Sequence, residues 1–200
     1  MDRGTKPMID VSLIGLFVGG RGTRMGGAAK GLLRAPEDDR TLVARLVDES
    51  RGLAREVLLV GTHEAYEALG LRAIADAQTG AGPLAGLVSL LREARGGRVI
   101  ALACDLPFID RAFLERLACS APEARILAPR REHGWEPLAA RYRSEDVLAI
   151  AQSRLVRGAL SLQSLLDEVG TTELVVEARE RDVLDDWDTP EDMARPRPRR

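Results

Sequence analysis

A short apolar run that ends in a glycine-rich segment constrains the fold more than any other feature of this sequence. Val11–Val18 is interrupted only by Ser12 and Gly15, and GGRGTRMGGAAK follows it directly at 19–30. A strand covered on both faces has such a near-continuous apolar sequence. Glycines let the backbone after it approach a ligand closely. This order predicts a buried strand that leads into a ligand-binding loop.

The rest of the chain alternates between strand-like and helix-like patterns. Val99–Ala103 is a second apolar run, whereas Leu84, Leu87, Val88 and Leu91 recur at helical spacing after Pro83. The alternation predicts an α/β fold with a mostly parallel sheet. We expect further strands at Val57–Val60, 71–75, Ile126–Ala128, Pro137–Tyr142, Leu174–Val176 and 182–184. We expect helices at 41–51 and Ala65–Leu69, two more that begin after the cap residues Asp110 and Ser144, and one that ends before Gly170.

Composition narrows the class of protein. The 200 residues suit a single domain, 1–200, in which we expect 1–9 and 195–200 to be flexible. A net charge of -2 and 4% aromatic residues give no basic or stacking surface, so no nucleic-acid partner is expected. The run Val11–Val18 is too short to span a membrane. Two cysteines without a CxxC spacing indicate a reducing compartment, and we expect a cytoplasmic protein.

The glycine-rich segment carries three cations, Arg21, Arg24 and Lys30. Successive backbone amides in such a loop form an anion-binding concavity, and with the cations they suit a polyphosphate. The dinucleotide fingerprint fails because Met25 stands at its third glycine, and the P-loop fails because Gly31 follows Lys30. Gly19, Gly20 and Gly22 are therefore expected to contact phosphates. The alternative is a flexible loop with solvated arginines.

Acidic residues supply the second half of the expected site. Asp105 directly follows the apolar run that ends at Cys104, and ligands of open parallel sheets lie beyond the carboxyl ends of strands. Magnesium prefers oxygen ligands, often one or two carboxylates with substrate phosphates. We expect Asp105 to bind Mg²⁺, with a helix cap as its alternative. Asp186, Asp188 or both would complete the metal site, unless Asp188 supports the start of a helix at Thr189.

Asp76 with the segment after it, and Trp135, each allow two interpretations. Asp76 and the Gly80–Gly86 segment, Gly82 included, either hold a nucleoside or form a turn. Trp135 either borders an acceptor pocket or packs. The two histidines, His63 and His133, have no carboxylate spacing typical of a zinc site and are expected to be surface or loop residues.

Taken in order, these segments resemble the molybdenum cofactor guanylyltransferases, the MobA-like nucleotidyltransferases. GLFVGGRGTRMGGAAKGLL at 15–33 is similar to the family loop LAGG-x-S-x-RMG-x-x-K-x-LL, with Phe17-Val18 in place of Leu-Ala and Thr23 in place of Ser. The later landmarks are GPLAGL at 82–87, CDLPFI at 104–109, EPLAARY at 136–142 and DTPEDM at 188–193. The resemblance covers about 11–194.

The resemblance implies a Rossmann-like nucleotidyltransferase fold, with a mixed sheet and helices on both faces. It implies transfer of GMP from GTP to the molybdenum–molybdopterin cofactor, and transient contacts with molybdenum-insertion proteins and target enzymes. It puts Phe17, Val18, Gly19 and Lys30 on GTP, Asp76 near the nucleoside, and Asp105 on GTP and Mg²⁺. Lys30 and Arg24 would balance phosphate charge beside Asp105 as the catalytic residues.

Other functions remain open at this point. Several guanylyltransferases have Asn-x-Asn where this chain has Asp186-Trp187-Asp188, so a cytidylyltransferase or sugar-1-phosphate nucleotidylyltransferase is one alternative. A nucleotide-binding accessory protein without catalysis is another. Every interpretation as a transferase requires one spatial arrangement. The first strand and the Val99–Ala103 strand must end side by side, with Lys30 and Asp105 in one cleft.

Overall fold

The apolar run at the start of the chain forms a central strand of a seven-stranded sheet. The structure is a computed structural model that describes residues 10–18, 29–35, 39–177, 180 and 182–187. β1, Val11–Phe17, is buried along its whole length and lies between β2, Glu56–Val60, and β4, Arg98–Ala103. Parallel strands on both sides pair with its backbone, and both of its faces are buried, which is why its sequence is apolar without alternation.

The sheet has the strand order β3-β2-β1-β4-β8-β5-β9. β3, β2, β1 and β4 run parallel, while β8 is antiparallel to both of its neighbours, β4 and β5. The sheet is therefore mixed but mostly parallel, as the sequence predicts. The remaining strands are β3 Ala73–Ile74, β5 Ile126–Ala128, β8 Ala139–Arg143 and β9 Thr171–Glu173, with a separate hairpin of β6 Arg130–Arg131 and β7 Gly134–Trp135.

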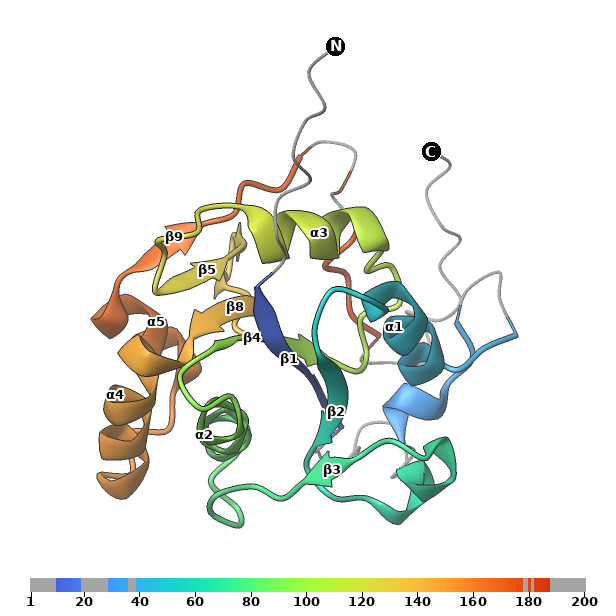
Figure 1. The fold of residues 1–200 in the computed structure, drawn as a ribbon, viewed down its shortest axis with the longest axis horizontal. Helices are drawn as coiled ribbons and strands as arrows, with labels where there is room; N and C mark the ends of the chain where they lie inside the picture. The colour runs from blue at the N-terminus through green and yellow to red at the C-terminus, as the bar shows by residue number, and fades with distance from the viewer. Residues whose placement is uncertain (1–9, 19–28, 36–38, 178–179, 181, 188–200) are drawn as a thin grey trace.

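Helices cover both faces of this sheet (Figure 1). α1 and α3 pack on one face against Ile14, Leu16 and Ile100. α2, α4 and α5 pack on the other face against Leu13 and Val99. The helices are α1 Leu42–Ser50, α2 Pro83–Glu93, α3 Arg111–Cys119, α4 Ser144–Val156 and α5 Leu162–Val169, with 3-10 turns η2 Lys30–Leu32 and η3 Glu64–Leu69.

Most of the expected elements are present, with corrections at their ends. Asp110 caps α3, because its carboxylate accepts from the Phe113 backbone N–H at 2.9 Å. The prediction that Ser144 caps α4 is wrong: the cap residue is Arg143, and the Ser144 hydroxyl donates to the Leu91 carbonyl on α2 at 2.6 Å. The strand predicted at 71–75 is shorter in the structure, where it covers only Ala73–Ile74.

Two strand predictions near the C-terminus are wrong. The sheet edge is Thr171–Glu173, and the chain leaves it at Leu174–Val176 because the Val175 carbonyl accepts from the Arg116 side chain instead of a neighbouring strand. Residues 182–184 form turns. No helix within the described part of the chain has the length and apolar character needed to cross a lipid bilayer.

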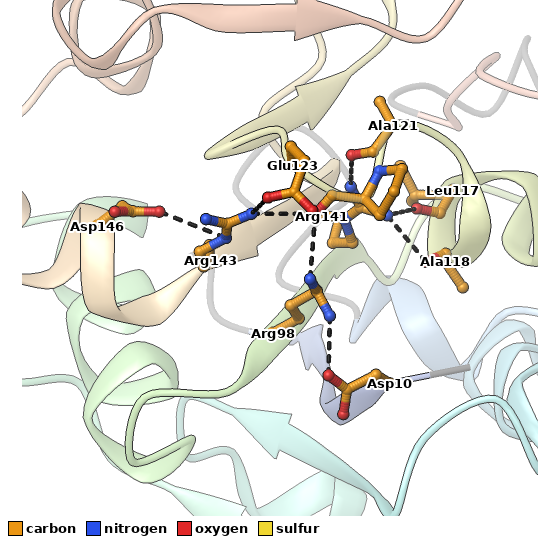
Figure 2. Close-up of polar contacts among 10 residues, drawn as sticks. Asp10, Arg98, Leu117, Ala118, Ala121, Glu123, Arg141, Arg143 and Asp146 are labelled. Atoms are coloured by element: carbon orange, nitrogen blue, oxygen red, sulfur yellow. Dashed lines mark hydrogen bonds and ion pairs between the residues drawn. The ribbon is translucent and has the colours of Figure 1, made fainter. Parts of the chain in front are cut away.

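One buried arginine joins the sheet to α3. Arg141 on β8 is 1% exposed, and its guanidinium donates to the carbonyls of Leu117, Ala118 and Ala121 at 3.1, 2.8 and 2.6 Å (Figure 2). These carbonyls lie at the end of α3, where backbone acceptors have no partner within the helix. Burial lowers the pKa of the Arg141 guanidinium to about 10, and the nearby charge of Arg98 adds to this effect. Arg141 thus closes the C-terminal end of α3.

Replacing Arg141 with methionine tests this contribution to stability. Arg141→Met replaces the charged side chain with an apolar one of roughly similar length and leaves buried carbonyls without a donor, so we expect a loss of about 1–3 kcal/mol in the free energy of unfolding. Urea denaturation measures it, with the exposed Arg55→Met as the control. Equal stability of the two variants would contradict the assigned role.

Candidate functional site

The carboxyl ends of β1 and β4 lie side by side. The two strands pair in parallel with Phe17 opposite Ala103, and the Cys104 backbone N–H donates to the Phe17 carbonyl at 3.3 Å. Val18 donates in turn to the Val60 carbonyl of β2 at 3.1 Å. The segments that follow the two strands therefore begin at one edge of the sheet, where open α/β sheets bind their ligands.

Lys30 and Asp105 meet at this edge. The Lys30 ammonium donates to Asp105 Oδ2 at 2.9 Å, although the residues are 75 positions apart in sequence. Each side chain is 19% exposed, so the ion pair is partly shielded from water yet open on one side. The predicted proximity of the two strand ends, and of Lys30 to Asp105, is confirmed, whereas a shared ligand-binding cleft stays a prediction. The alternative of Asp105 as a cap of α3 is wrong, because Asp110 has that place.

A tyrosine that the sequence interpretation missed lies directly behind this pair. Tyr66 is 2% exposed, and its hydroxyl oxygen accepts from the Gly31 backbone N–H at 3.0 Å. The hydroxyl also interacts with the Cys104 thiol. Burial raises the pKa of the Tyr66 phenol and raises that of Cys104 to about 12, so both groups are neutral at pH 7. Cys104 packs in the core as predicted.

Trp187 closes the site from the other end of the chain. Its backbone N–H donates to the Asp105 carbonyl at 3.0 Å. Its indole is 5% exposed, packs against Ala35 and Leu42 near the Lys30 segment, and meets the Phe108 ring edge-on with centroids 6.4 Å apart. Trp187 thereby ties the segment after Lys30 to the segment after Asp105. Composition alone gave no signal for this contact.

The same contact brings the acidic segment before Trp187 towards Asp105. Arg131 anchors that segment by donating to the Leu184 carbonyl at 2.7 Å and to the Asp185 carboxylate at 2.9 Å. Burial raises the pKa of the Glu136 carboxyl, Arg131 opposes the rise, and the charge of Asp186 adds to it. The charge of Asp186 therefore acts on the Glu136 carboxyl, so the segment before Trp187 lies near Glu136.

Asp76 lies beside Phe17 on the face covered by α2. A Cβ added to Gly86 of α2 would lie 2.7 Å from Val60 Cγ1, 2.9 Å from Phe17 Cε1 and 3.1 Å from Asp76 Oδ1. Only glycine at position 86 allows α2 to approach β1 and the Asp76 carboxyl so closely. Asp76 as a residue is exposed, but burial of its carboxyl end raises its pKa. Phe17 is itself buried in the core.

Gly82 precedes α2 as its N-terminal cap residue and has a positive φ of 67°. It is exposed, 6 residues along the chain from Asp76, within the loop that joins β3 to α2. This geometry confirms the interpretation of Gly82 as a turn residue. Contact of Gly82 with a nucleoside stays a prediction.

Trp135 has a packing role. Its indole N–H donates to the Asp167 carboxylate at 2.9 Å, and its backbone N–H and carbonyl both bond to the Gln163 side chain of α5. The Arg130 guanidinium lies 5.1 Å from the centre of its ring. These contacts fix the β6–β7 hairpin to α5. The packing reading of Trp135 is therefore favoured over a contact with an acceptor.

Several predicted site residues lie outside the described residues. They are Gly19, Gly20, Arg21, Gly22, Arg24 and Asp188, and the flexible segments expected at 1–9 and 195–200 also fall there. Among the residues that the structure does describe, no group of three or more His, Cys, Asp or Glu side chains is placed to hold a metal ion by itself. His63 and His133 are exposed, as predicted.

Neutralising Asp76 is expected to stabilise the fold in a pH-dependent way. A raised pKa in the fold means that the ionised carboxylate costs stability as the pH rises through the pKa. Asp76→Asn stays neutral, so its Tm at pH 7 is expected to exceed that of the wild type by roughly 1–2 °C, a solvent-screened effect. The difference should vanish near pH 3. Scanning calorimetry checks this, with exposed Asp39→Asn as the control. A difference that is constant with pH would contradict the explanation.

Comparison with known proteins places this geometry in a family. The family model described as the MobA-like NTP transferase domain matches residues 16–173. A protein named molybdenum cofactor guanylyltransferase from Pseudomonas putida is 34% identical over 155 residues, which is 76% of this chain and 80% of the relative. A probable molybdenum cofactor guanylyltransferase from Clostridium perfringens is 27% identical over 128 residues, 64% of each chain.

Solved structures show the same fold at lower identity. Molybdopterin-guanine dinucleotide biosynthesis protein A from Archaeoglobus fulgidus superposes with a TM-score of 0.74 at 22% identity, covering 91% of this chain and 95% of that one. The 2-C-methyl-D-erythritol 4-phosphate cytidylyltransferase from Thermus thermophilus has a TM-score of 0.65 at 18% identity, covering 92% and 96%. The expected Rossmann-like nucleotidyltransferase fold is confirmed. Because the family model matches most of the chain, this protein belongs to the MobA-like NTP transferase family.

Proposed function

We propose that this protein transfers GMP from GTP to the molybdenum–molybdopterin cofactor, producing the guanine dinucleotide cofactor and pyrophosphate. The observation that carries the proposal is the Lys30–Asp105 pair at the converging ends of β1 and β4. A cation and a carboxylate at one sheet edge suit a metal-bound triphosphate. In a nucleotidyltransferase of this family, that combination favours the GTP site.

The names of the relatives support the choice of substrate. The relative from Pseudomonas putida, 34% identical over 76% of this chain, is named a molybdenum cofactor guanylyltransferase. A cytidylyltransferase shares the fold at only 18% identity. Guanine is therefore preferred over cytosine or a sugar-nucleotide product, even though Asp186-Trp187-Asp188 replaces the Asn-x-Asn of several guanylyltransferases.

The proposed reaction is an in-line displacement at the α-phosphorus of GTP. A phosphate oxygen of the acceptor forms the new P–O bond as the bond between the α-phosphorus and the bridging oxygen breaks, and pyrophosphate leaves with that bond's electron pair. The attacking oxygen is already anionic, so no strong general base is needed. The main requirements are positioning and charge neutralisation. Lys30 and Arg24 would supply positive charge to the phosphates.

The remaining ligand contacts are proposed on the same basis. Gly19, Gly20, Arg21 and Gly22 would bind phosphates through their loop amides and charge. Phe17 ends β1 and Val18 follows it, directly before this loop, and both would contact GTP. Asp76 would lie near the nucleoside, in the loop that ends at Gly82.

The chemistry of the residues at Asp105 fits a magnesium ion. Its carboxylate offers hard oxygen ligands and is partly open to solvent. Magnesium typically takes only one or two protein carboxylates and completes its shell with phosphates and water, so a preformed three-residue cluster is not required. When bound, the ion would supply Lewis-acid neutralisation of phosphate charge. Asp186 or Asp188 is the proposed second carboxylate.

A cellular compartment and protein partners can also be proposed. Both cysteines are free thiols, which supports a reducing, cytoplasmic compartment. On the basis of the family resemblance, we also propose transient contacts with molybdenum-insertion proteins and with target enzymes.

Removing either member of the ion pair is expected to slow the reaction. Asp105→Asn and Lys30→Ala should each lower kcat by about 10²–10³-fold, the usual loss when a preorganised charge at a transition state is deleted. Pyrophosphate release with GTP, Mg²⁺ and molybdopterin cofactor measures it. Asp48→Asn, which alters two ion pairs of α1, with Arg40 and Arg51, is the control. Near-normal turnover of either site variant would contradict these roles.

Nucleotide preference is testable without the acceptor. A ligand that binds only the native state raises the apparent Tm, so GTP with Mg²⁺ should raise it more than CTP, ATP or UTP at equal concentration. Omitting Mg²⁺ should reduce the GTP effect, because the cation that would offset the charges of the phosphates and Asp105 is then missing. A larger shift with CTP would favour the cytidylyltransferase alternative. Binding of GTP without any pyrophosphate release would favour an accessory protein.

A further inference from the structure

Tyr66 touches the neighbours of both members of the ion pair. Its hydroxyl accepts from the N–H of Gly31, the residue after Lys30, at 3.0 Å. The same hydroxyl interacts with the side chain of Cys104, the residue before Asp105. One buried group therefore lies between the backbone segments that carry the ammonium and the carboxylate.

Close packing at Gly31 makes this contact specific. A Cβ added to Gly31 would lie 2.4 Å from Val43 Cγ2 and 2.9 Å from the Tyr66 hydroxyl oxygen. The lack of a side chain at Gly31 lets the phenol reach the backbone amide. The amide is buried, so no solvent acceptor replaces the hydroxyl if it is removed.

The Tyr66 ring is itself held in place. Tyr66 lies in η3, whose first turn is capped by His63: the Ala65 backbone N–H donates to His63 Nδ1 at 3.2 Å. The two rings meet edge-on with centroids 5.6 Å apart. Tyr66 is 2% exposed, so neighbouring residues enclose the phenol and its hydroxyl has a defined place next to Gly31.

We propose that Tyr66 is a positioning residue for nucleotidyl transfer, which sets where Lys30 stands relative to Asp105 by anchoring Gly31. The proposal rests on the proposed function and extends it to a residue outside the strand-end motifs. Tyr66 itself faces the core and acts through Lys30. A displacement of about 1 Å in a positioned group can cost on the order of 10²-fold in rate.

Tyr66→Phe is the direct test, because it removes one oxygen and keeps the ring. We expect kcat to fall by roughly 10- to 100-fold while KM for GTP changes by less than about 3-fold, since misplaced charge affects the transition state more than ground-state binding. In a Lys30→Ala background, Tyr66→Phe should cause no further loss of kcat, because its effect passes through Lys30.

The matched control is Ser144→Ala. It also removes a buried hydroxyl, which donates to the Leu91 carbonyl at 2.6 Å, but near the start of β4 rather than its carboxyl end. Both variants are assayed at a temperature well below the lower of their Tm values, so that loss of folded protein does not contribute. A kcat loss in Tyr66→Phe alone supports positioning. Equal losses in the two variants, or full kcat in Tyr66→Phe, overturn it.

Hydrogen exchange of the protein without ligands gives a readout besides activity. The peptide that contains Gly31 should exchange faster in Tyr66→Phe than in the wild type, because the amide loses its acceptor, and should be unchanged in Ser144→Ala. Unchanged exchange in Tyr66→Phe would overturn the proposal. If the wild type releases no pyrophosphate with GTP, the proposed function is wrong, and so is the catalytic role of Tyr66. If the wild type and Tyr66→Phe are both fully active, only the positioning role is wrong.

Discussion

The ion pair between Lys30 and Asp105 is the interaction on which the account of the site depends. It joins segments 75 residues apart at a distance of 2.9 Å, with each side chain 19% exposed. At such partial burial, opposite charges attract more strongly than on an open surface. The pair keeps a cation and an oxygen ligand together at a solvent-accessible point. A metal-bound phosphate chain needs both groups there.

The sheet and its supporting contacts produce this proximity. The parallel register of β1 and β4 places Phe17 opposite Ala103, so the chain leaves both strands at the same edge. Tyr66 contacts Gly31, next to Lys30, and Trp187 contacts both the segment after Lys30 and the Asp105 carbonyl. Arg141 ties α3 to β8 and thereby fixes the helix that follows the Asp105 segment. Contacts between parts of the chain that are distant in sequence therefore hold the site together.

Local sequence pattern predicted the parts of the fold in which local and long-range preferences agree. The runs Val11–Val18 and Val99–Ala103 are apolar because both faces are buried, and the predicted strands match β1 and β4 closely. Asp110 was identifiable as a cap because its hydrogen bond is local. The strand-end rule placed Asp105, and the resemblance placed Lys30, at one edge.

Long-range contacts account for what the sequence did not predict. Ser144 has the residue type of a cap, but its hydroxyl is taken by the Leu91 carbonyl of another helix. Leu174–Val176 has a strand-like composition, but the Val175 carbonyl accepts a hydrogen bond from the Arg116 side chain rather than from a neighbouring strand. Tyr66 and Trp187 act through partners distant in sequence, so no spacing marks them. For Arg24 and Asp188, which lie outside the described residues, the expected roles remain predictions.

The most direct measurement of the central claim is a crystal structure of the protein with Mg²⁺ and an α,β-methylene analogue of GTP, which cannot release pyrophosphate. The account predicts that the triphosphate lies between the ends of β1 and β4, with Lys30 contacting a phosphate oxygen and Asp105 contacting the metal. A nucleotide bound elsewhere, with the Lys30–Asp105 pair intact and not contacting it, would contradict the account.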